Sequence, residues 1–133
     1  MSESIESAPR ALVAGHADFA SGLVSAVELI TGQGGLLELV QVKALCSDDI
    51  RSLLAARLQA TGARVIFTDL QAGSCSMAAR RVLGEVEGAV LISGTNLPML
   101  LDFVLSREPD PVLAARATIE RGRSSMTVMG GRA

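Results

Sequence analysis

The chain contains a single histidine, His16, which directly follows a short apolar run at residues 11–15. An amphipathic pattern begins at once after it, so the run predicts a buried strand that places the imidazole at the rim of a sheet, beside a helix. In open parallel α/β sheets, ligands and reacting groups lie just beyond the carboxyl ends of the strands. An imidazole there could be a nucleophile or a general base, although a histidine without any chemical task is an equally simple interpretation.

Asp69 is a second candidate, because it ends the apolar run at residues 64–68 as His16 ends the first run. Adjacent strands lie about 4.8 Å apart. If these two strands are neighbours, the carboxylate can accept a hydrogen bond from Nδ1–H of His16. This bond would fix the tautomer and orientation of the ring and leave Nε2 free. Considered alone, Asp69 could instead cap the following turn.

The third feature is the segment Ala72-Gly73-Ser74, at the expected entrance to a helix. Small residues before a helix expose backbone N–H groups that can bind a phosphate or an oxyanion, but they are also typical of a tight turn with an N-cap. Together, the three features predict one site at a sheet edge. Its catalytic residues are His16 and Asp69, and its phosphate-binding residues are Gly73 and Ser74.

Other chemistries have less support in the sequence. GxGxxG after the first strand, a P-loop and a G-x-S-x-G elbow are all missing. A serine triad of Ser74 with His16 and Asp69 has no clear oxyanion partner. Cys75 could be a reactive thiol at a helix start, or a small buried residue. With two cysteines and one histidine, the roughly four ligands of structural zinc are not available. We therefore expect no metal and no cofactor.

The elements that would position these residues alternate along the chain. Strands are expected at residues 11–15, 36–44, 64–68 and 88–93. A helical pattern follows each strand. The first three end near Gly32, Gly62 and Leu83. After the fourth strand, one helix starts at about residue 97, and another starts at residue 110 and ends near Gly122. Residues 123–129 could be a fifth strand. This alternation predicts an α/β fold, with a parallel sheet covered by helices on both faces.

Composition restricts the class of protein. The 133 residues are 49% hydrophobic, which predicts one domain at residues 10–133 after a polar tail at residues 1–9. A net charge of −2 and 2% aromatic residues argue against a nucleic-acid partner. The richest apolar run, residues 97–105, contains Pro98 and Asp102, so no membrane insertion is expected. No signal peptide is evident, and two unpaired cysteines favour a cytoplasmic protein.

Three segments, in order, carry a resemblance to a known family: AGHADFASGLVSAVELITG, VIFTDLQAGSCSMAA and ISGTNLPMLLDFVL. They resemble the enzyme IIA domain of the mannose family (mannose/fructose/sorbose/N-acetylgalactosamine) of the bacterial phosphoenolpyruvate:sugar phosphotransferase system. The resemblance implies a single-domain three-layer sandwich around a four-stranded parallel sheet of order 2-1-3-4, which places strands one and three side by side. It also implies a homodimer that exchanges a C-terminal strand, a role that residues 123–129 could fill.

The same resemblance implies a function. The chain would be a phosphotransferase component for sugar uptake. His16 would accept a phosphoryl group on Nε2 from the histidine-containing phosphocarrier protein and pass it to a IIB protein or domain. Asp69 would hydrogen-bond the other ring nitrogen, and amides around Gly73 and Ser74 would support the phosphate. Two alternatives are a phosphoryl-donor domain for dihydroxyacetone kinase, and a regulatory or interaction domain of this fold that no longer transfers phosphate.

The sequence departs from the family pattern near the expected site. Ala17 and Ala72 stand where glycines are usual, Cys75 replaces a proline, and Met77 replaces an asparagine. Alanine tolerates fewer backbone conformations than glycine. We therefore expect the loop at residues 72–77 to differ from the family in its shape and its phosphate contacts, and we expect a smaller effect on the histidine.

Overall fold

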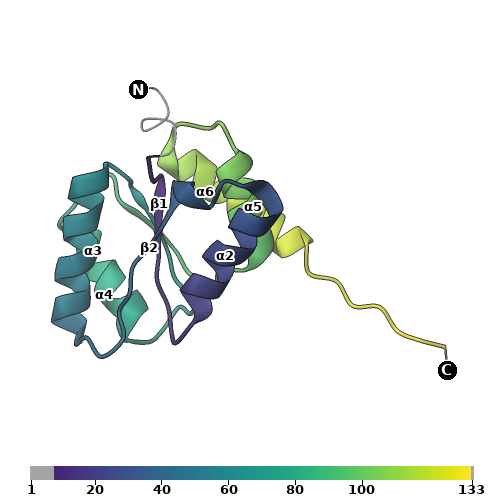
Figure 1. Ribbon diagram of the computed structural model, residues 1–133, viewed down its shortest axis with the longest axis horizontal. Helices are drawn as coiled ribbons and strands as arrows, with labels where there is room; N and C mark the ends of the chain where they lie inside the picture. The colour runs from purple at the N-terminus through teal and green to yellow at the C-terminus, as the bar shows by residue number, and fades with distance from the viewer. Residues whose placement is uncertain (1–7, 133) are drawn as a thin grey trace.

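A computed structural model describes residues 8–132 of the chain (Figure 1). It contains one four-stranded sheet, in which every neighbouring pair of strands is parallel and the order is β2-β1-β3-β4. The strands are β1 (Ala11–Val13), β2 (Leu37–Leu39), β3 (Val65–Phe67) and β4 (Val90–Ile92). The predicted fold class and sheet order are confirmed. Most of the predicted tail at residues 1–9 lies outside the described residues.

Helices cover both faces of the sheet (Figure 1). One layer consists of α2 (Phe19–Thr31), α5 (Leu97–Leu105) and α6 (Pro111–Ser124). The other layer consists of α3 (Ser47–Thr61) and α4 (Ser74–Val82), and a single 3₁₀ turn, η1 (Gly34–Leu36), precedes β2. Among the helices within residues 8–132, none has the length and apolar character needed to cross a membrane.

The alternation of side chains along the strands explains the two layers. Val13 and Phe67 point into the core beneath α2, α5 and α6, whereas Leu12 and Ile66 belong to the core beneath α3 and α4. All four side chains are fully buried. Successive strand residues face opposite sides of a sheet, so strands covered on both faces must be apolar at every position. This requirement accounts for the uninterrupted apolar sequences of the two central strands, β1 and β3.

Several predicted boundaries were wrong. The strand expected at residues 36–44 is only three residues long, because the chain leaves the sheet after Val40 and turns at residues 42–45. Arg123 and Ser124, expected in a fifth strand, are the last residues of α6. From residue 126 to residue 132, the described chain has no helix or strand and extends away from the body (Figure 1).

Candidate active site at the carboxyl ends of β1 and β3

The register of the two central strands brings the predicted pair together. Val13 pairs with Phe67. Two residues beyond these positions, the chain reaches Gly15 after β1 and Asp69 after β3, and His16 directly follows Gly15. Because the strands are parallel and in register, the two chain segments leave the sheet at the same level and on the same edge. His16 and Asp69 are thus close together because β1 and β3 are neighbours in the sheet and end at the same level.

A single carboxylate oxygen holds the histidine in two places. Oδ2 of Asp69 accepts a hydrogen bond from the backbone N–H of His16, at 2.8 Å, and lies 2.7 Å from its Nδ1. Oδ1 accepts a hydrogen bond from the backbone N–H of Leu70, at 2.9 Å. The side chain of Asp69 is 9% exposed and that of His16 is 58% exposed. The acid is therefore enclosed, whereas the ring is open to solvent.

The charge state of Asp69 determines the tautomer of the ring. Burial acts to raise the pKa of Asp69, but the hydrogen bonds from the backbone and the ring of His16 outweigh it, and the pKa lies below its ordinary value. The group is thus an ionised carboxylate near neutral pH, and a carboxylate can only accept hydrogen bonds. It follows that Nδ1 is the donor, and that Nε2 of the neutral ring carries the available lone pair.

Gly73 lies beside the free edge of the ring, at the N-cap of α4. A Cβ built on it would be 3.2 Å from Cε1 of His16 and 3.7 Å from its Nε2. Its φ of +104° is a backbone conformation that strongly favours glycine. The first N–H groups of α4, beginning at the exposed Ser74, have no acceptor within the helix and carry its partial positive charge. The predicted anion-binding residues therefore adjoin the predicted nucleophilic nitrogen.

Sequence reasoning missed a group of hydroxyl residues that anchors the loop after β3. Thr68 Oγ1 accepts a hydrogen bond from Ser76 Oγ, at 2.8 Å, and lies 3.2 Å from Ser93 Oγ. The same hydroxyl of Ser76 also contacts the carbonyl oxygen of Leu70, and Thr95 Oγ1 donates to the carbonyl oxygen of Thr68. These bonds tie the end of β3 to α4 and to the chain after β4. Isolated serines and threonines give no long-range signal in a sequence.

Cys75 is a buried packing residue. It is 3% exposed and belongs to the core beneath α3 and α4. Burial raises the pKa of its thiol to about 11, and the nearby charge of Asp69 adds to the effect. Reactive cysteines have lowered pKa values and partial exposure. The structure therefore favours the buried interpretation of Cys75 over the reactive thiol.

A small hollow of about 200 Å³ opens beside His16. Its wall includes Ser74, Cys75, and the turn at residues 42–45. Among the described residues that line it, Lys43 is the only lysine or arginine, and the sequence pattern did not single it out. Within residues 8–132, no three His, Cys, Asp or Glu side chains are grouped closely enough to hold a metal ion.

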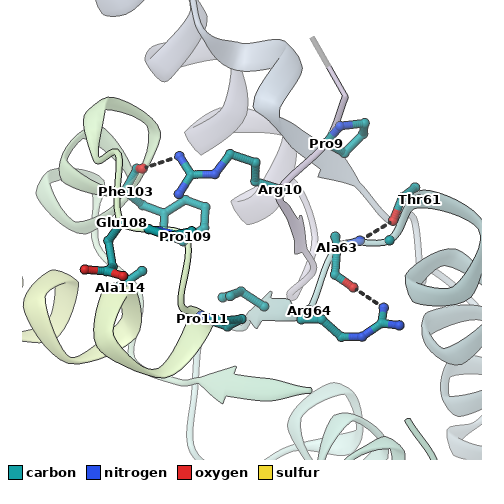
Figure 2. Close-up of a pocket in the computed structure, with 12 residues that line it drawn as sticks. Pro9, Arg10, Thr61, Ala63, Arg64, Phe103, Glu108, Pro109, Pro111 and Ala114 are labelled. Atoms are coloured by element: carbon teal, nitrogen blue, oxygen red, sulfur yellow. Dashed lines mark hydrogen bonds between the residues drawn. The ribbon is translucent and has the colours of Figure 1, made fainter. Parts of the chain in front are cut away.

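A larger hollow of about 330 Å³ lies at the opposite end of the sheet (Figure 2). Its two arginines point away from one another, and each is engaged with backbone carbonyl groups. Arg10 donates to the carbonyl oxygens of Phe103 and Ser106, and Arg64 donates to those of Leu58 and Ala63. These contacts hold the two guanidinium groups against the carboxyl-terminal ends of α5 and α3, so we assign this hollow a structural role.

The fold and the site together define the class: this is an α/β protein with a histidine–aspartate pair at the carboxyl edge of its sheet. Comparison with known proteins identifies the family. The family model described as PTS system fructose IIA component matches residues 10–120. The chain belongs to this family, the mannose-type IIA components of the sugar phosphotransferase system. No curated protein matches the chain significantly.

Solved structures share the fold. The mannose/sorbose specific IIA subunit of the phosphotransferase system from Enterococcus faecalis has a TM-score of 0.82 at 20% identity, covering 94% of this chain and 97% of that one. The phosphotransferase system component EIIA from Streptococcus agalactiae has a TM-score of 0.76 at 22% identity, with coverages of 90% and 95%. The PTS IIA protein associated with the fucose utilization operon from Streptococcus pneumoniae has a TM-score of 0.67 at 20% identity, with coverages of 89% and 90%.

Proposed function

We propose that the protein is a phosphohistidine carrier, which accepts a phosphoryl group on Nε2 of His16 from the histidine-containing phosphocarrier protein and passes it to a IIB component. The observation that carries the proposal is the geometry of one ring. Its Nδ1 is 2.7 Å from the Asp69 carboxylate, while its Nε2 edge faces Gly73 and solvent. Membership of the IIA family supports the same role.

The transfer step needs no proton movement at His16. The lone pair of Nε2 forms a bond to phosphorus as the nitrogen–phosphorus bond of the donor breaks and its electron pair returns to the donor ring. The ring of His16 becomes a phosphorylated imidazolium, which keeps its proton on Nδ1 and is stabilised by the adjacent carboxylate of Asp69. Phosphoryl transfer depends mainly on positioning and charge stabilisation. We expect the first N–H groups of α4 to bind the phosphoryl oxygens, since Gly73, at the N-cap of α4, adjoins the Nε2 edge of the ring.

Labelled phosphoenolpyruvate, enzyme I and the phosphocarrier protein test this role directly. We expect an acid-labile, base-stable phosphate on the wild type, and none on His16→Gln. In Asp69→Asn the rate of labelling should fall about 10-fold to 100-fold, because a hydrogen bond to a charged group contributes about 1.5–3 kcal/mol. A wild type that stays unlabelled would contradict the proposal.

The acceptor is found by adding purified partners to the labelled protein. Discharge by a IIB protein supports sugar uptake, and discharge by a dihydroxyacetone kinase subunit would instead support the donor role for that enzyme. A label that persists with both acceptors would indicate a regulatory domain. The altered loop gives no reason to prefer this last outcome, because Ala72, unlike Gly73, does not have a positive φ and fits as alanine.

We also propose a homodimer that exchanges the C-terminal segment. The edge strand β4 lies open beside a groove of about 670 Å³, whose lining includes Leu91, Ile119 and Met126. Val128 and Met129 are almost fully exposed in the single chain. An exposed edge strand is a template for pairing with another chain. Sedimentation should give a dimer for the full chain and a monomer after truncation at residue 125; a full-length monomer would contradict the proposal.

A further inference from the structure

The hollow beside His16 contains a basic residue that the transfer scheme above does not use. Lys43 lines this hollow together with His16 and Ser74, and within residues 8–132 no other lysine or arginine lines it. In the part of the chain that the structure describes, its ammonium group makes one ion pair, with Oδ1 of Asp18 at 3.5 Å. The two side chains are 67% and 86% exposed. An exposed pair at this distance contributes little free energy, so Lys43 can leave Asp18 at small cost.

A tight turn fixes the position of Lys43. The backbone N–H of Leu45 donates to the carbonyl oxygen of Val42, at 3.2 Å, so Lys43 and Ala44 are the two central residues of the turn. Ala44 has a φ of +62°. A β-turn with its third residue in the left-handed region normally contains glycine there, and alanine in this conformation is strained. Strained residues are kept where the surrounding structure requires the geometry. Here the strained turn holds Lys43 at the rim of the hollow.

The electrostatics of the phosphorylated state call for a cation at this place. A phosphoryl group on Nε2 adds up to about two negative charges. It would join the carboxylate of Asp69, which contacts the ring, and that of Asp18, two residues along the chain from His16. The helix N-terminus supplies only partial positive charge. Among the described residues that line the hollow, Lys43 alone carries a permanent full positive charge.

We propose that Lys43 is a positioning and charge-neutralising residue for the phosphorylated state, exchanging its ion pair with Asp18 for one with the phosphoryl group on His16. This inference rests on the proposed function. It makes Asp18 a competitor: when His16 is unmodified, Asp18 holds the ammonium group, and the incoming phosphoryl group displaces it. Attraction between a twice-charged phosphoryl group and the lysine exceeds that of a single carboxylate at equal distance.

The test compares Lys43→Met, Lys43→Arg and Asp18→Asn with the wild type. Arg81→Met is the matched control, because it also removes one positive charge and one exposed ion pair, with Asp48, but does not line the hollow. Each protein is phosphorylated with phosphoramidate, from which phosphorus passes to Nε2 as its bond to nitrogen breaks and ammonia leaves with a proton from the solvent. Circular dichroism establishes that each variant is folded.

The readout is the protonation of the phosphoryl group, followed by ³¹P NMR against pH, a quantity that a purely structural residue would not move. In Lys43→Met we expect a proton affinity about two- to fivefold higher than in the wild type, as for loss of one exposed ion pair. Lys43→Arg should restore the wild-type value, Asp18→Asn should lower the affinity, and Arg81→Met should leave it unchanged. High salt should reduce the difference between Lys43→Met and the wild type.

Equal titration curves for the wild type and Lys43→Met would overturn the inference, and so would an equal shift in Arg81→Met. This outcome differs from failure of the proposed function, in which the wild type takes no label from the phosphocarrier protein although phosphoramidate modifies it. If phosphoramidate also fails to modify His16, there is no phosphorylated state for Lys43 to stabilise, and both proposals are overturned.

Discussion

Gly15 lies against the carboxyl group of Asp69, so closely that a Cβ built on it would be 3.0 Å from both Cγ and Oδ2 of that residue. The same Cβ would be 3.0 Å from the ring of Phe19. The pairing of β1 with β3 sets this contact, since the two residues stand at the same level beyond their strands. Glycine is therefore needed here for space, so that the acid can approach the backbone and the ring of His16.

Replacing Gly15 by alanine should damage both stability and the site. The added methyl group must displace Asp69 or Phe19, and overpacking of this kind typically costs about 1–3 kcal/mol of unfolding free energy. Because Asp69 also orients His16, phosphorylation of the ring should slow in the same variant. Urea denaturation and the labelling assay measure the two effects.

Gly22→Ala is the control for that experiment. Gly22 lies inside α2, and a Cβ built on it would have no atom within 4 Å. Alanine is favoured over glycine in a helix interior, so this variant should gain about 0.5–1 kcal/mol. If Gly15→Ala were as stable as the wild type and fully active, the contact with Asp69 would not constrain the site.

The pairing of His16 with Asp69 could be predicted because each follows a short apolar run and parallel strands end at one edge. That β1 and β3 are neighbours came from the family resemblance; periodicity alone left it open. The role of Lys43 could not be predicted, since residues 36–44 read as one continuous strand although the chain turns within them. The end of α6 was also predicted wrongly at Gly122, because helical hydrogen bonding continues past this residue to Ser124.

Asp69 should make stability depend on pH in acid. Its pKa in the folded protein lies below the ordinary value of about 4, so its stabilising contribution is complete above about pH 4. The contribution is lost as the pH falls further, through the lowered pKa of the folded state. At pH 5, Asp69→Asn should therefore be less stable than the wild type by about 1–3 kcal/mol, and the difference should shrink towards pH 3.

Urea titrations at pH 5, 4 and 3 measure this difference. Asp18→Asn is the matched control: its carboxyl group is 86% exposed and its ion pair is long, so its unfolding free energy should stay close to that of the wild type. A gap between Asp69→Asn and the wild type that is constant or grows towards pH 3 would show that the hydrogen bonds from His16 do not stabilise the carboxylate.

The two cysteines should differ sharply in reactivity. Cys46 is exposed and Cys75 is buried, with a thiol pKa of about 11. At pH 8 only about one in a thousand Cys75 side chains would be thiolate, the reactive form. Iodoacetamide should modify Cys46 in the folded protein and reach Cys75 only in urea, as followed by peptide mass spectrometry. In Cys46→Ser the folded protein should stay unmodified. Rapid modification of Cys75 in the folded protein would instead support the interpretation of Cys75 as a reactive thiol.

Ala17→Gly should stabilise the protein, although it removes a side-chain atom. Ala17 directly follows His16 and has a φ of +47°, in the left-handed region that costs a non-glycine residue about 1–2 kcal/mol. Glycine removes this strain but gives the unfolded chain more freedom, which offsets part of the gain. We expect a net increase of up to about 1 kcal/mol in unfolding free energy. Ala72→Gly is the control, because Ala72 has no positive φ, and it should be neutral or slightly destabilising. If Ala17→Gly were instead destabilising by the same amount as Ala72→Gly, the backbone at residue 17 would not be strained.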